Sequence, residues 1–418
     1  MTFPGPSAPP IVQLAMYAAD PLGTLERWSR QHGETFRARF AGVGDFVFTS
    51  SPDHIREIFA APPDVLAAGP ENAGLAPVVG ARSLLVLDGA EHVRHRRLVL
   101  PLFHGQRMRA IGELVRACAA DAIDRWPIGR PCELGPRLGE LALAVTIRML
   151  FSSDALAAPF ERLFRAFGSP AIPLLAYWGI DVVERMPWLA AARRKAELDD
   201  ALYRELAHRR SRPAPDDDGL ALLMSARDAD DRPLTDGELR DELVSLVVAG
   251  HETVAGALAW ALELLLDHPA ALARAAEDPE YLDAAIKESL RLRPALALVA
   301  RKARAPFTLA GTRLPPGTWL APSIHLVHHR ADLYPEPGAF RPERFLGTKP
   351  DPYRWLPFGG GGRRCIGMGF ALLELKSILG AILERLHVRS LRRTPAAIAR
   401  RNITLVPAGD VPVVCTLT

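Results

Sequence analysis

The sequence predicts a mainly helical protein with a smaller β region, an α+β fold class. Apolar residues recur with the helical period along most of the 418 residues, most regularly from Thr235 to Leu266. Aromatic and β-branched residues alternate at Thr35–Phe40 and Asp45–Ser50 around a glycine-rich turn, which indicates a β-hairpin. Between Phe358 and Gly367 a glycine run leads to a single cysteine, directly before another apolar helical pattern. We therefore expect a helical body, a small β part and a loop that presents one thiol.

The composition is that of an ordinary globular protein, with 49% hydrophobic and 24% charged residues. We expect a single domain over residues 1–418, with its β-rich part near residues 33–60, 299–321 and 403–418. The net charge of +3 is too small to indicate a nucleic-acid partner. Four cysteines lack metal-ligand spacing, which favours a reducing, cytoplasmic location. They are Cys118, Cys132, Cys365 and Cys415.

The N-terminal apolar run Ile11–Ala19 is short, contains Gln13 and follows a proline-rich stretch without a basic region. These features argue against both a signal peptide and a membrane span. We therefore expect a soluble protein.

The first elements follow from their end signals. Pro21–His32 is predicted to be a helix closed by Gly33, and Ser51-Pro52 begins a short helix after the hairpin. Ala61–Arg82 is rich in Pro, Gly and Ala with little periodicity, so we expect a long, partly irregular loop.

The next predicted helix, from Gly89 to Leu100, carries His92 and Arg96 four residues apart, hence on one face. By residues alone this is a basic surface helix. Further helical patterns follow at Arg107–Trp126, Pro136–Phe151, Pro159–Phe167 and Trp188–Arg210.

The helix from Thr235 to Leu266 is the longest, and Thr235 with Glu238 forms a capping-box pattern at its start. It is apolar almost all round and should be buried. The run Ala249-Gly250-His251-Glu252-Thr253 breaks this pattern with a mid-helix glycine and a charge. Such conflicts tend to mark function.

Two other interpretations of this run are weighed. A zinc site fails because the second histidine of His-Glu-x-x-His would fall at Ala255. Packing of another helix at Ala249 and Gly250, with Glu252 in a structural ion pair, remains open.

The C-terminal half continues with a helix at Pro279–Leu292, in which Glu288 and Arg291 share a face. Pro306–Leu320 is predicted to be a hairpin with turns at Gly311 and Pro315-Pro316-Gly317. Two strand patterns, Ile403–Val406 and Val411–Thr418, end the chain.

The run ending at Cys365 places a thiol before a helix N-terminus, where backbone N–H groups favour negative charge and lower a cysteine pKa. The glycines allow left-handed backbone and close approach to a flat ligand. A phosphate loop is disfavoured because no Lys-Ser/Thr follows the glycines. A buried, inert cysteine is the remaining alternative.

The pattern Phe-x-x-Gly-x-Arg-x-Cys-x-Gly, filled by Phe358, Gly361, Arg363, Cys365 and Gly367, resembles the haem-binding loop of the cytochrome P-450 superfamily. The run from Ala249 to Thr253 is similar to that family's Ala-Gly-x-Glu/Asp-Thr motif, although Val254 replaces a frequent second threonine. Matching motifs occur from His92 to Gly367 in the family's order, so the resemblance covers nearly the whole chain.

The resemblance implies the cytochrome P-450 fold, with haem b (iron protoporphyrin IX) as cofactor and Cys365 as the axial ligand of the iron. It implies that Ala249 and Gly250 open a groove for dioxygen, while Glu252 and Thr253 relay protons. The implied cofactor-binding residues are Cys365, His92, Arg96, Arg301, Arg363, Phe358, Gly359 and Gly367. The implied structural lock is Glu288, Arg291 and Arg344. The implied substrate pocket is Val79, Leu246, Ala249, Leu298, Val299, Ile403 and Thr404.

The resemblance further implies a monomeric monooxygenase that uses O2 to hydroxylate a lipophilic small molecule, a terpenoid or steroid first and a fatty acid second. No electron-transfer module lies in the chain, so we expect a separate ferredoxin and ferredoxin reductase. An acidic ferredoxin would dock near Arg94, Arg97 and Arg364. A peroxide-driven peroxygenase, a non-catalytic haem sensor or carrier and a haem-free structural protein are the alternatives.

Overall fold

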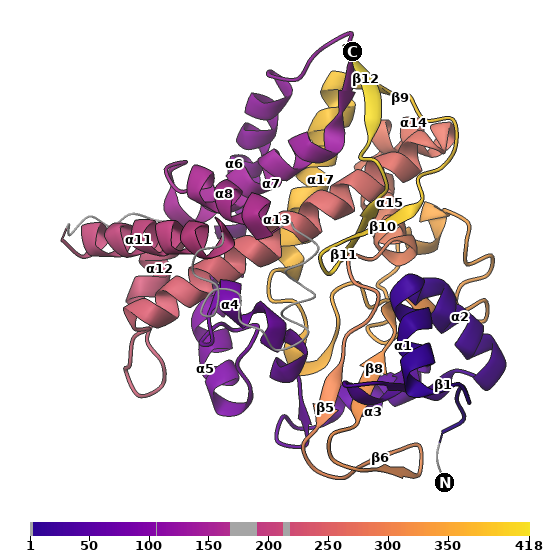
Figure 1. The fold of residues 1–418 in the computed structure, drawn as a ribbon. Coiled ribbons are helices and arrows are strands. Elements are labelled where there is room, and N and C mark those ends of the chain that lie inside the picture. The colour runs from indigo at the N-terminus through magenta and orange to yellow at the C-terminus, as the bar shows by residue number, and fades with distance from the viewer. Residues whose placement is uncertain (1–2, 106, 168–189, 212–217) are drawn as a thin grey trace. The chain divides into compact units, whose positions relative to one another are not determined.

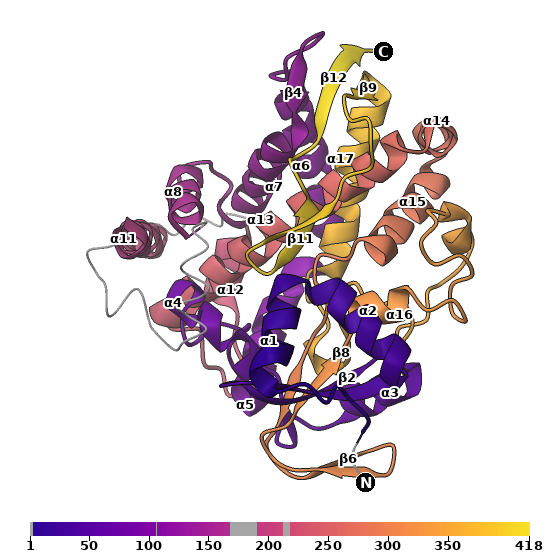
Figure 2. The same cartoon turned by 45° about the vertical axis from the view of Figure 1, so that its right-hand side comes forward.

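The computed structural model describes residues 3–105, 107–167, 190–211 and 218–418. The chain folds as two compact units (Figures 1 and 2). The first unit comprises Met1–Glu71 and Asp278–Cys365, and the second comprises Asn72–Glu277 and Ile366–Thr418.

The first unit contains helices and the strands of the five-stranded sheet. Its helices are α1 (Pro10–Ala19), α2 (Pro21–His32), α3 (Pro52–Ala60), α15 (Pro279–Leu292) and α16 (Ile324–His328). Its strands are β1 (Thr35–Phe40), β2 (Gly44–Thr49), β3 (Leu66–Ala67), β5 (Arg301–Ala303), β6 (Phe307–Leu309), β7 (Thr312–Leu314) and β8 (Trp319–Pro322). Short 3₁₀ turns lie at η3 (Pro342–Phe345) and η4 (Gly361–Arg363).

Five strands of the first unit form one sheet in the order β1-β2-β8-β5-β3, and β6 pairs only with β7. The predicted β1–β2 hairpin is confirmed, with Phe36 opposite Phe48. These two rings stack with centroids 5.5 Å apart, which buries the apolar face of the hairpin.

The second unit is mostly helical. Its helices are α4 (Ala76–Val79), α5 (Gly89–Val99), α6 (Arg107–Ile123), α7 (Leu134–Phe151), α8 (Ala157–Phe167), α11 (Ala190–Ser211), α12 (Gly219–Ser225), α13 (Asp236–Leu266), α14 (Pro269–Glu277) and α17 (Met368–Arg385). Its strands are β4 (Pro131–Glu133), β9 (Leu386–Ser390), β10 (Ile398–Arg401), β11 (Thr404–Pro407) and β12 (Pro412–Leu417). The strand orders are β4-β12-β9 and β10-β11. The 3₁₀ segment η2 (Leu100–Phe103) also belongs to this unit, while η1 (Gly69–Leu75) begins in the first unit and ends in the second.

Helix α13 is the core of the second unit, and α7, α11, α17 and β11 pack around it (Figure 1). Its 31 residues span about 46 Å. The predicted capping box is confirmed: the Thr235 N–H donates to Glu238 Oε2 at 2.7 Å, and the Glu238 N–H donates to Thr235 Oγ1 at 3.3 Å. By length and composition α13 could cross a membrane, but 61% of its most apolar window is buried, as in the core helix of a globular protein.

Several segments differ from the sequence prediction, and strands β4 and β9 lie outside the ranges in which β structure was expected. The expected irregular loop Ala61–Arg82 contains β3 and α4, because Leu66 and Ala67 pair with residues of β5 that are remote in sequence. Strand β10 was not predicted, since its exposed arginines carry no apolar alternation and only pairing with β11 makes it a strand. Helix α11 matches the predicted helix from Ala190 onward, while Trp188 lies outside the described residues.

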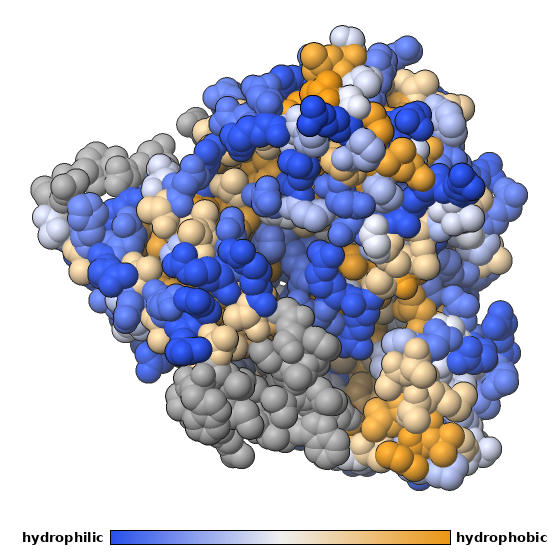
Figure 3. All heavy atoms as spheres, turned by 45° about the horizontal axis from the view of Figure 1, so that its top comes forward, coloured by the Kyte–Doolittle hydropathy of each residue, from blue (hydrophilic) through white to orange (hydrophobic). Residues whose placement is uncertain are grey.

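The molecular surface is of mixed character. The face in Figure 3 is largely hydrophilic, and hydrophobic residues interrupt it in small groups. Among the described residues, Ile11, Val12 and Met16 on α1 are exposed apolar side chains. These three residues lie within two turns of one helix, and exposed apolar atoms in general are common on globular proteins.

Candidate functional site

Cys365 lies on an exposed loop of the first unit. The Cys365 N–H donates to the Phe358 carbonyl at 2.9 Å, which closes the loop on itself. Helix α17 begins at Met368 with Gly367 as its N-cap, so the thiol precedes the first helical residue by three positions. The exposure of Cys365 excludes the alternative of a buried packing cysteine.

The glycines of the loop serve a close contact inside the first unit. Gly359 and Gly361 have positive φ of 64° and 63°. A Cβ at Gly360 would lie 2.3 Å from the Phe59 ring, and one at Gly361 would lie 2.5 Å from the Phe59 carbonyl oxygen. The missing Cβ atoms of Gly360 and Gly361 therefore let the loop rest on α3, and the expected close approach of the loop to a flat ligand stays a prediction.

Arg301 and Val299 lie beside this loop. The Arg301 guanidinium stands 5.6 Å from the centroid of the Phe59 ring, and its Nη1 donates to the Ala300 carbonyl at 2.7 Å. A Cβ at Gly359 would lie 3.7 Å from Val299 Cγ1. Because Arg301 is only 7% exposed, the first unit holds a buried cation next to the cysteine loop.

Glu71 is a functional candidate that the sequence did not reveal. Its carboxylate lies 3.9 Å from Arg301 Nη1 and accepts the Ala300 N–H at 2.7 Å. Burial raises its pKa to about 7, against the lowering effect of Ala300, Arg301 and Arg363. It lies in the segment expected to be an irregular loop, where no periodicity indicates burial.

Glu288, Arg291 and Arg344 meet in a buried ion-pair cluster of the first unit. Arg291 donates to both carboxylate oxygens of Glu288, at 2.7 and 2.8 Å, and Arg344 Nε lies 3.3 Å from the same carboxylate. The remaining donors of Arg291 reach the carbonyls of His328, Pro337 and Ala339. All five guanidinium N–H groups are thus used, which balances the cost of burying the charge.

His328 extends this cluster toward the cysteine loop and was missed in the sequence. It is fully buried, its Nδ1 lies 3.0 Å from the Arg291 carbonyl, and its Nε2 accepts the Leu356 N–H at 2.8 Å. This arrangement requires the Nδ1–H tautomer, and burial lowers the pKa of His328, so the ring is neutral. The cluster and the chain just before Phe358 are thereby joined.

In the second unit, one stretch of the buried helix α13 is accessible. Residues Leu246, Ala249, Gly250 and Thr253 are half-buried or exposed, while the helix on either side is almost entirely buried. Their spacing places them on one face. The continuous helix is therefore exposed to solvent at the stretch where its apolar sequence pattern is interrupted.

Within this stretch, Thr253 Oγ1 donates to the Ala249 carbonyl at 2.5 Å, a bond to the preceding turn. A Cβ at Gly250 would lie 3.1 Å from Thr146 Oγ1 on α7. The smallness of Gly250 thus allows α7 to pack, in agreement with the packing alternative for this residue.

Glu252 lies half-buried on the same stretch and meets the tip of the β10–β11 hairpin. Asn402 Nδ2 donates to its two carboxylate oxygens, at 3.2 and 3.3 Å. Burial raises the pKa of Glu252, and the Asn402 amide, Arg401 and Thr404 lower it, with a net rise. The structure does not support the alternative that Glu252 forms a structural ion pair, because the group that donates to its carboxylate is the neutral amide of Asn402.

Helix α5 carries His92, which is 5% exposed, and Arg96, which is half-buried. Arg94 on the same helix donates to Asp228 Oδ2 at 2.6 Å and Glu238 Oε1 at 2.8 Å. The hypothesis that Arg94 docks an acidic partner is wrong, because two carboxylates of the second unit hold its guanidinium. Arg97 and Arg364 are exposed.

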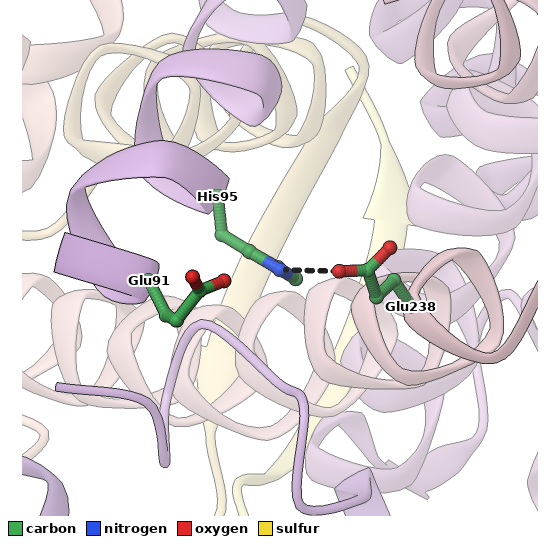
Figure 4. A group of neighbouring side chains, drawn as sticks. All are labelled: Glu91, His95 and Glu238. Carbon is green, nitrogen blue, oxygen red and sulfur yellow. Dashed lines mark hydrogen bonds and ion pairs between the residues drawn. The ribbon is translucent and has the colours of Figure 1, made fainter. Parts of the chain in front are cut away.

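Glu91, His95 and Glu238 converge between α5 and α13 (Figure 4), with one ligand atom each within 4.8 Å of the others. Such a group could hold a metal ion by geometry alone. Here Arg94 donates to Glu238, and Arg94 Nη1 lies 3.3 Å from His95 Nε2. Since Glu238 already accepts from Arg94 and pairs with His95, which also pairs with Glu242, we interpret this group as an ion-pair network.

The remaining predicted residues fall in several environments. Phe358 packs edge-on against Trp355, 5.9 Å between centroids, and Gly367 lies near the Phe103 ring. Leu298 and Val299 are half-buried against the cores of the first unit. In the second unit Ile403 is 48% exposed, whereas Val79 and Thr404 are buried.

Comparison with known proteins explains this arrangement. The cytochrome P450 family model matches residues 3–409. Cytochrome P450 135B1 of Mycobacterium tuberculosis is 37% identical over 421 residues, which cover 97% of this chain and 89% of the relative. Cytochrome P450 137 of the same organism is 36% identical over 404 residues, 94% of this chain and 85% of the relative. The chain belongs to the cytochrome P450 family.

The P450 fold is confirmed by a solved structure titled "Retinoic acid bound cyanobacterial CYP120A1". It matches with a TM-score of 0.85, covers 100% of this chain and 99% of its own, and is 23% identical. At this identity the likeness shows the fold alone.

P450 proteins are haem monooxygenases, so this chain is an oxidoreductase with haem as its cofactor. The residues present fit that group in each unit. The first unit offers an exposed thiol on a closed loop beside the buried cation Arg301. The second unit offers the accessible stretch of α13 and the buried His92. A thiol that can ionise, a buried arginine and a histidine with N–H donors are groups that can bind haem iron and its carboxylates.

Proposed function

We propose that this P450 is an O2-dependent hydroxylase of lipophilic small molecules that receives electrons from a separate ferredoxin and ferredoxin reductase. The observation that supports O2 as the oxidant is the acid and alcohol pair, Glu252 and Thr253, on the accessible stretch of α13. In the overall reaction one oxygen atom of O2 enters a C–H bond and the other leaves as water, with two electrons and two protons consumed.

The cofactor roles are assigned residue by residue. Cys365 would hold the iron as thiolate ligand, and His92, Arg96 and Arg301 would bind the haem carboxylates. The bound haem would supply the chemistry of dioxygen activation and oxygen transfer. Phe358, Gly359, Arg363 and Gly367 would shape the loop that carries the thiolate.

The proton route runs through the second unit. Thr253, whose hydroxyl donates to the Ala249 carbonyl, would turn to donate its proton at the reacting oxygen. Glu252 would resupply that proton through water, because burial raises its pKa and keeps it closer to neutral pH than an ordinary carboxyl group. Ala249 and Gly250 would leave room for dioxygen.

The substrate class rests on the mostly apolar character of the proposed pocket residues, which are Val79, Leu246, Ala249, Leu298, Val299, Ile403 and the polar Thr404. A terpenoid or steroid is the first candidate and a fatty acid the second. The structural neighbour's title names retinoic acid, a lipophilic carboxylic acid, as bound to that protein. A screen for substrate-induced spin shifts with terpenoids, steroids and fatty acids would identify the class.

We further propose that the enzyme acts as a monomer in the cytoplasm. An acidic ferredoxin would be attracted by exposed arginines such as Arg97 and Arg364.

The test of the proposal uses the reduced, carbon monoxide-bound protein, whose red-shifted Soret band reports thiolate ligation. We expect this band in the wild type and in a Thr253→Ala variant, and its loss in Cys365→Ala. In Thr253→Ala, product formed per O2 should fall about tenfold or more, because the proton donor is lost. Thr308→Ala, an exposed threonine on β6, is the matched control.

Three results would reject the proposal. Peroxide-supported turnover that exceeds the O2 reaction and ignores Thr253→Ala would identify a peroxygenase. Absence of product with any reductase would identify a sensor or carrier. A colourless purified protein would identify a haem-free role.

A further inference from the structure

The carboxylate of Glu252 is held by a strand turn that lies 150 positions later in the chain. Asn402, at the tip of the β10–β11 hairpin, donates from one amide nitrogen to both carboxylate oxygens. Thr404 and Arg401 of the same tip also act on this carboxyl and lower its pKa against the effect of burial. One hairpin tip therefore supplies the polar environment of Glu252 within the described part of the second unit.

The hairpin is anchored to α13 along one face of the helix. Gly256 and Trp260 follow Glu252 at intervals of four residues, so the three positions face the hairpin together. Trp260 Nε1 donates to the Leu405 carbonyl at 3.0 Å, and a Cβ at Gly256 would lie 3.2 Å from Val406 Cγ1. These two contacts determine how far the tip extends over Glu252.

The residue type at position 402 suits this role. Asn402 has a φ of 50°, in the left-handed region that asparagine tolerates better than most residues. Its own carbonyl accepts from Arg400 Nε at 2.8 Å, which holds the turn closed. The amide is thus presented toward Glu252 by a turn that asparagine itself favours.

The charged groups around Glu252 leave the amide as its direct donor. Arg401 Nη2 lies 3.3 Å from Asp410 Oδ1, so the positive charge of Arg401 is partly balanced by this carboxylate. His251, the neighbour on α13, stacks on Phe164 with centroids 4.6 Å apart. Burial lowers the pKa of His251 to about 4, so this ring is neutral near pH 7.

We propose that Asn402 is a positioning residue of the proton relay, which holds the Glu252 carboxylate in place and tunes how readily it releases its proton. This inference rests on the proposed function, since it concerns the partner of the relay acid. An amide donor favours the charged carboxylate and fixes its orientation. Because Ile403 at the same tip is 48% exposed, a substrate that contacts the tip would also reach the group that holds Glu252.

Two substitutions test the hydrogen bond without straining the turn. Asn402→Gly removes the amide and keeps the left-handed backbone, and Asn402→Asp keeps the shape but replaces the donor with a negative charge. Asp231→Gly, at another exposed turn residue with a φ of 60°, is the matched control.

The first measurement is an infrared titration of the Glu252 carboxyl band in the haem-loaded protein, with the band assigned by its loss in Glu252→Gln. We expect the midpoint to move to higher pH in Asn402→Gly and further in Asn402→Asp, and to stay unchanged in Asp231→Gly. The second measurement is product formed per O2, which should fall roughly three- to tenfold in both Asn402 variants.

The results separate this inference from the proposed function. If Glu252→Gln leaves product per O2 unchanged, the relay itself is rejected. If Glu252→Gln impairs it while both Asn402 variants titrate and react like the wild type, Asn402 is not a positioning residue. A loss of product in the Asn402 variants without the ordered shift of the midpoint would likewise overturn the inference, because it would indicate a general disturbance of the hairpin.

Discussion

Gly361 occupies a position where the backbone leaves no room for a side chain. Its φ of 63° lies in the left-handed region, and a Cβ would come within 2.5 Å of the Phe59 carbonyl oxygen. A Cβ placed at the neighbouring Gly362 would have no atom within 4 Å. Two adjacent glycines of the cysteine loop therefore differ in what they contribute to the fold.

Gly361→Ala is expected to reduce the free energy of unfolding by about 2 kcal/mol or more, since a left-handed alanine costs about 1–2 kcal/mol before the overlap with Phe59 is added. Gly362→Ala should stay within about 0.5 kcal/mol of the wild type. Urea unfolding measures both values, and the carbon monoxide spectrum reports whether the loop still presents Cys365. Equal stability of the two variants would contradict the assignment of Gly361 to the contact with α3.

At the scale of elements, α5 is fastened to α13 by charged groups. His95 on α5 is 1% exposed and its Nδ1 lies 2.7 Å from Glu242 Oε1 on α13. Burial lowers the pKa of His95, but the hydrogen bond to Glu242 and the charges of Glu242 and Glu238 outweigh this effect and raise it overall. The helix that carries His92 and Arg96 is thus joined to α13 through His95, whose charged form is favoured by its carboxylate partners.

The sign of the pH dependence follows from this raised pKa. The stabilisation by His95 should be complete below its unfolded-state pKa of about 6.5 and should be lost as the pH rises through the higher folded-state value. We expect the free energy of unfolding to fall over that range in the wild type. His95→Leu should be less stable by about 3–5 kcal/mol at low pH, because Glu242 loses a buried partner, and should lack this pH dependence.

Urea unfolding between pH 6 and 9 provides the measurement. His387→Leu, at an exposed position of β9, is the control and should keep the wild-type pH profile. The charged groups that face His95 are Arg94, Glu91, Glu238 and Glu242. A wild-type stability that rises through the same pH range would contradict the prediction.

At the scale of the whole molecule, the chain combines a small net charge of +3 with many arginines, and a good number of those that the structure describes form ion pairs or hydrogen bonds. Arg94 shows that an arginine in a basic run of the sequence can serve an internal ion pair and not a surface contact. An exposed arginine can attract an acidic partner over distance, whereas the charge of a buried arginine such as Arg94 is largely balanced by its carboxylate partners.

Arg97→Glu and Arg364→Glu, tested separately, should each lower the second-order rate of reduction by an acidic ferredoxin about tenfold at low ionic strength. The difference should shrink as salt is added, because exposed charges are screened. Stopped-flow reduction measures both effects, with Arg313→Glu on β7 as an exposed control. Rates that neither variant changes and that do not depend on salt would show that these arginines do not guide the encounter.

Local patterns in the sequence were sufficient for the fold class and the motifs. The β1–β2 hairpin, the capping box of α13 and the helix α15 with Glu288 and Arg291 were predicted from neighbouring residues alone. These features depend on periodicity, end signals and turn residues, which are interactions between residues close in the chain. The resemblance of the cysteine loop to P450 proteins likewise came from a short run of residues.

The sequence by itself determined that this is a mainly helical P450 chain with a cysteine loop and an acid-alcohol pair on a buried helix. Tertiary structure decided which groups surround those residues: Phe59 under the glycines, Glu71 beside Arg301, His328 behind Arg291 and Asn402 against Glu252. The reason is physical. Helix and turn signals act over a few residues. The contact of Glu252 with Asn402 joins segments that lie 150 positions apart in the chain. The local sequence pattern of one segment does not indicate which distant segment will pack against it.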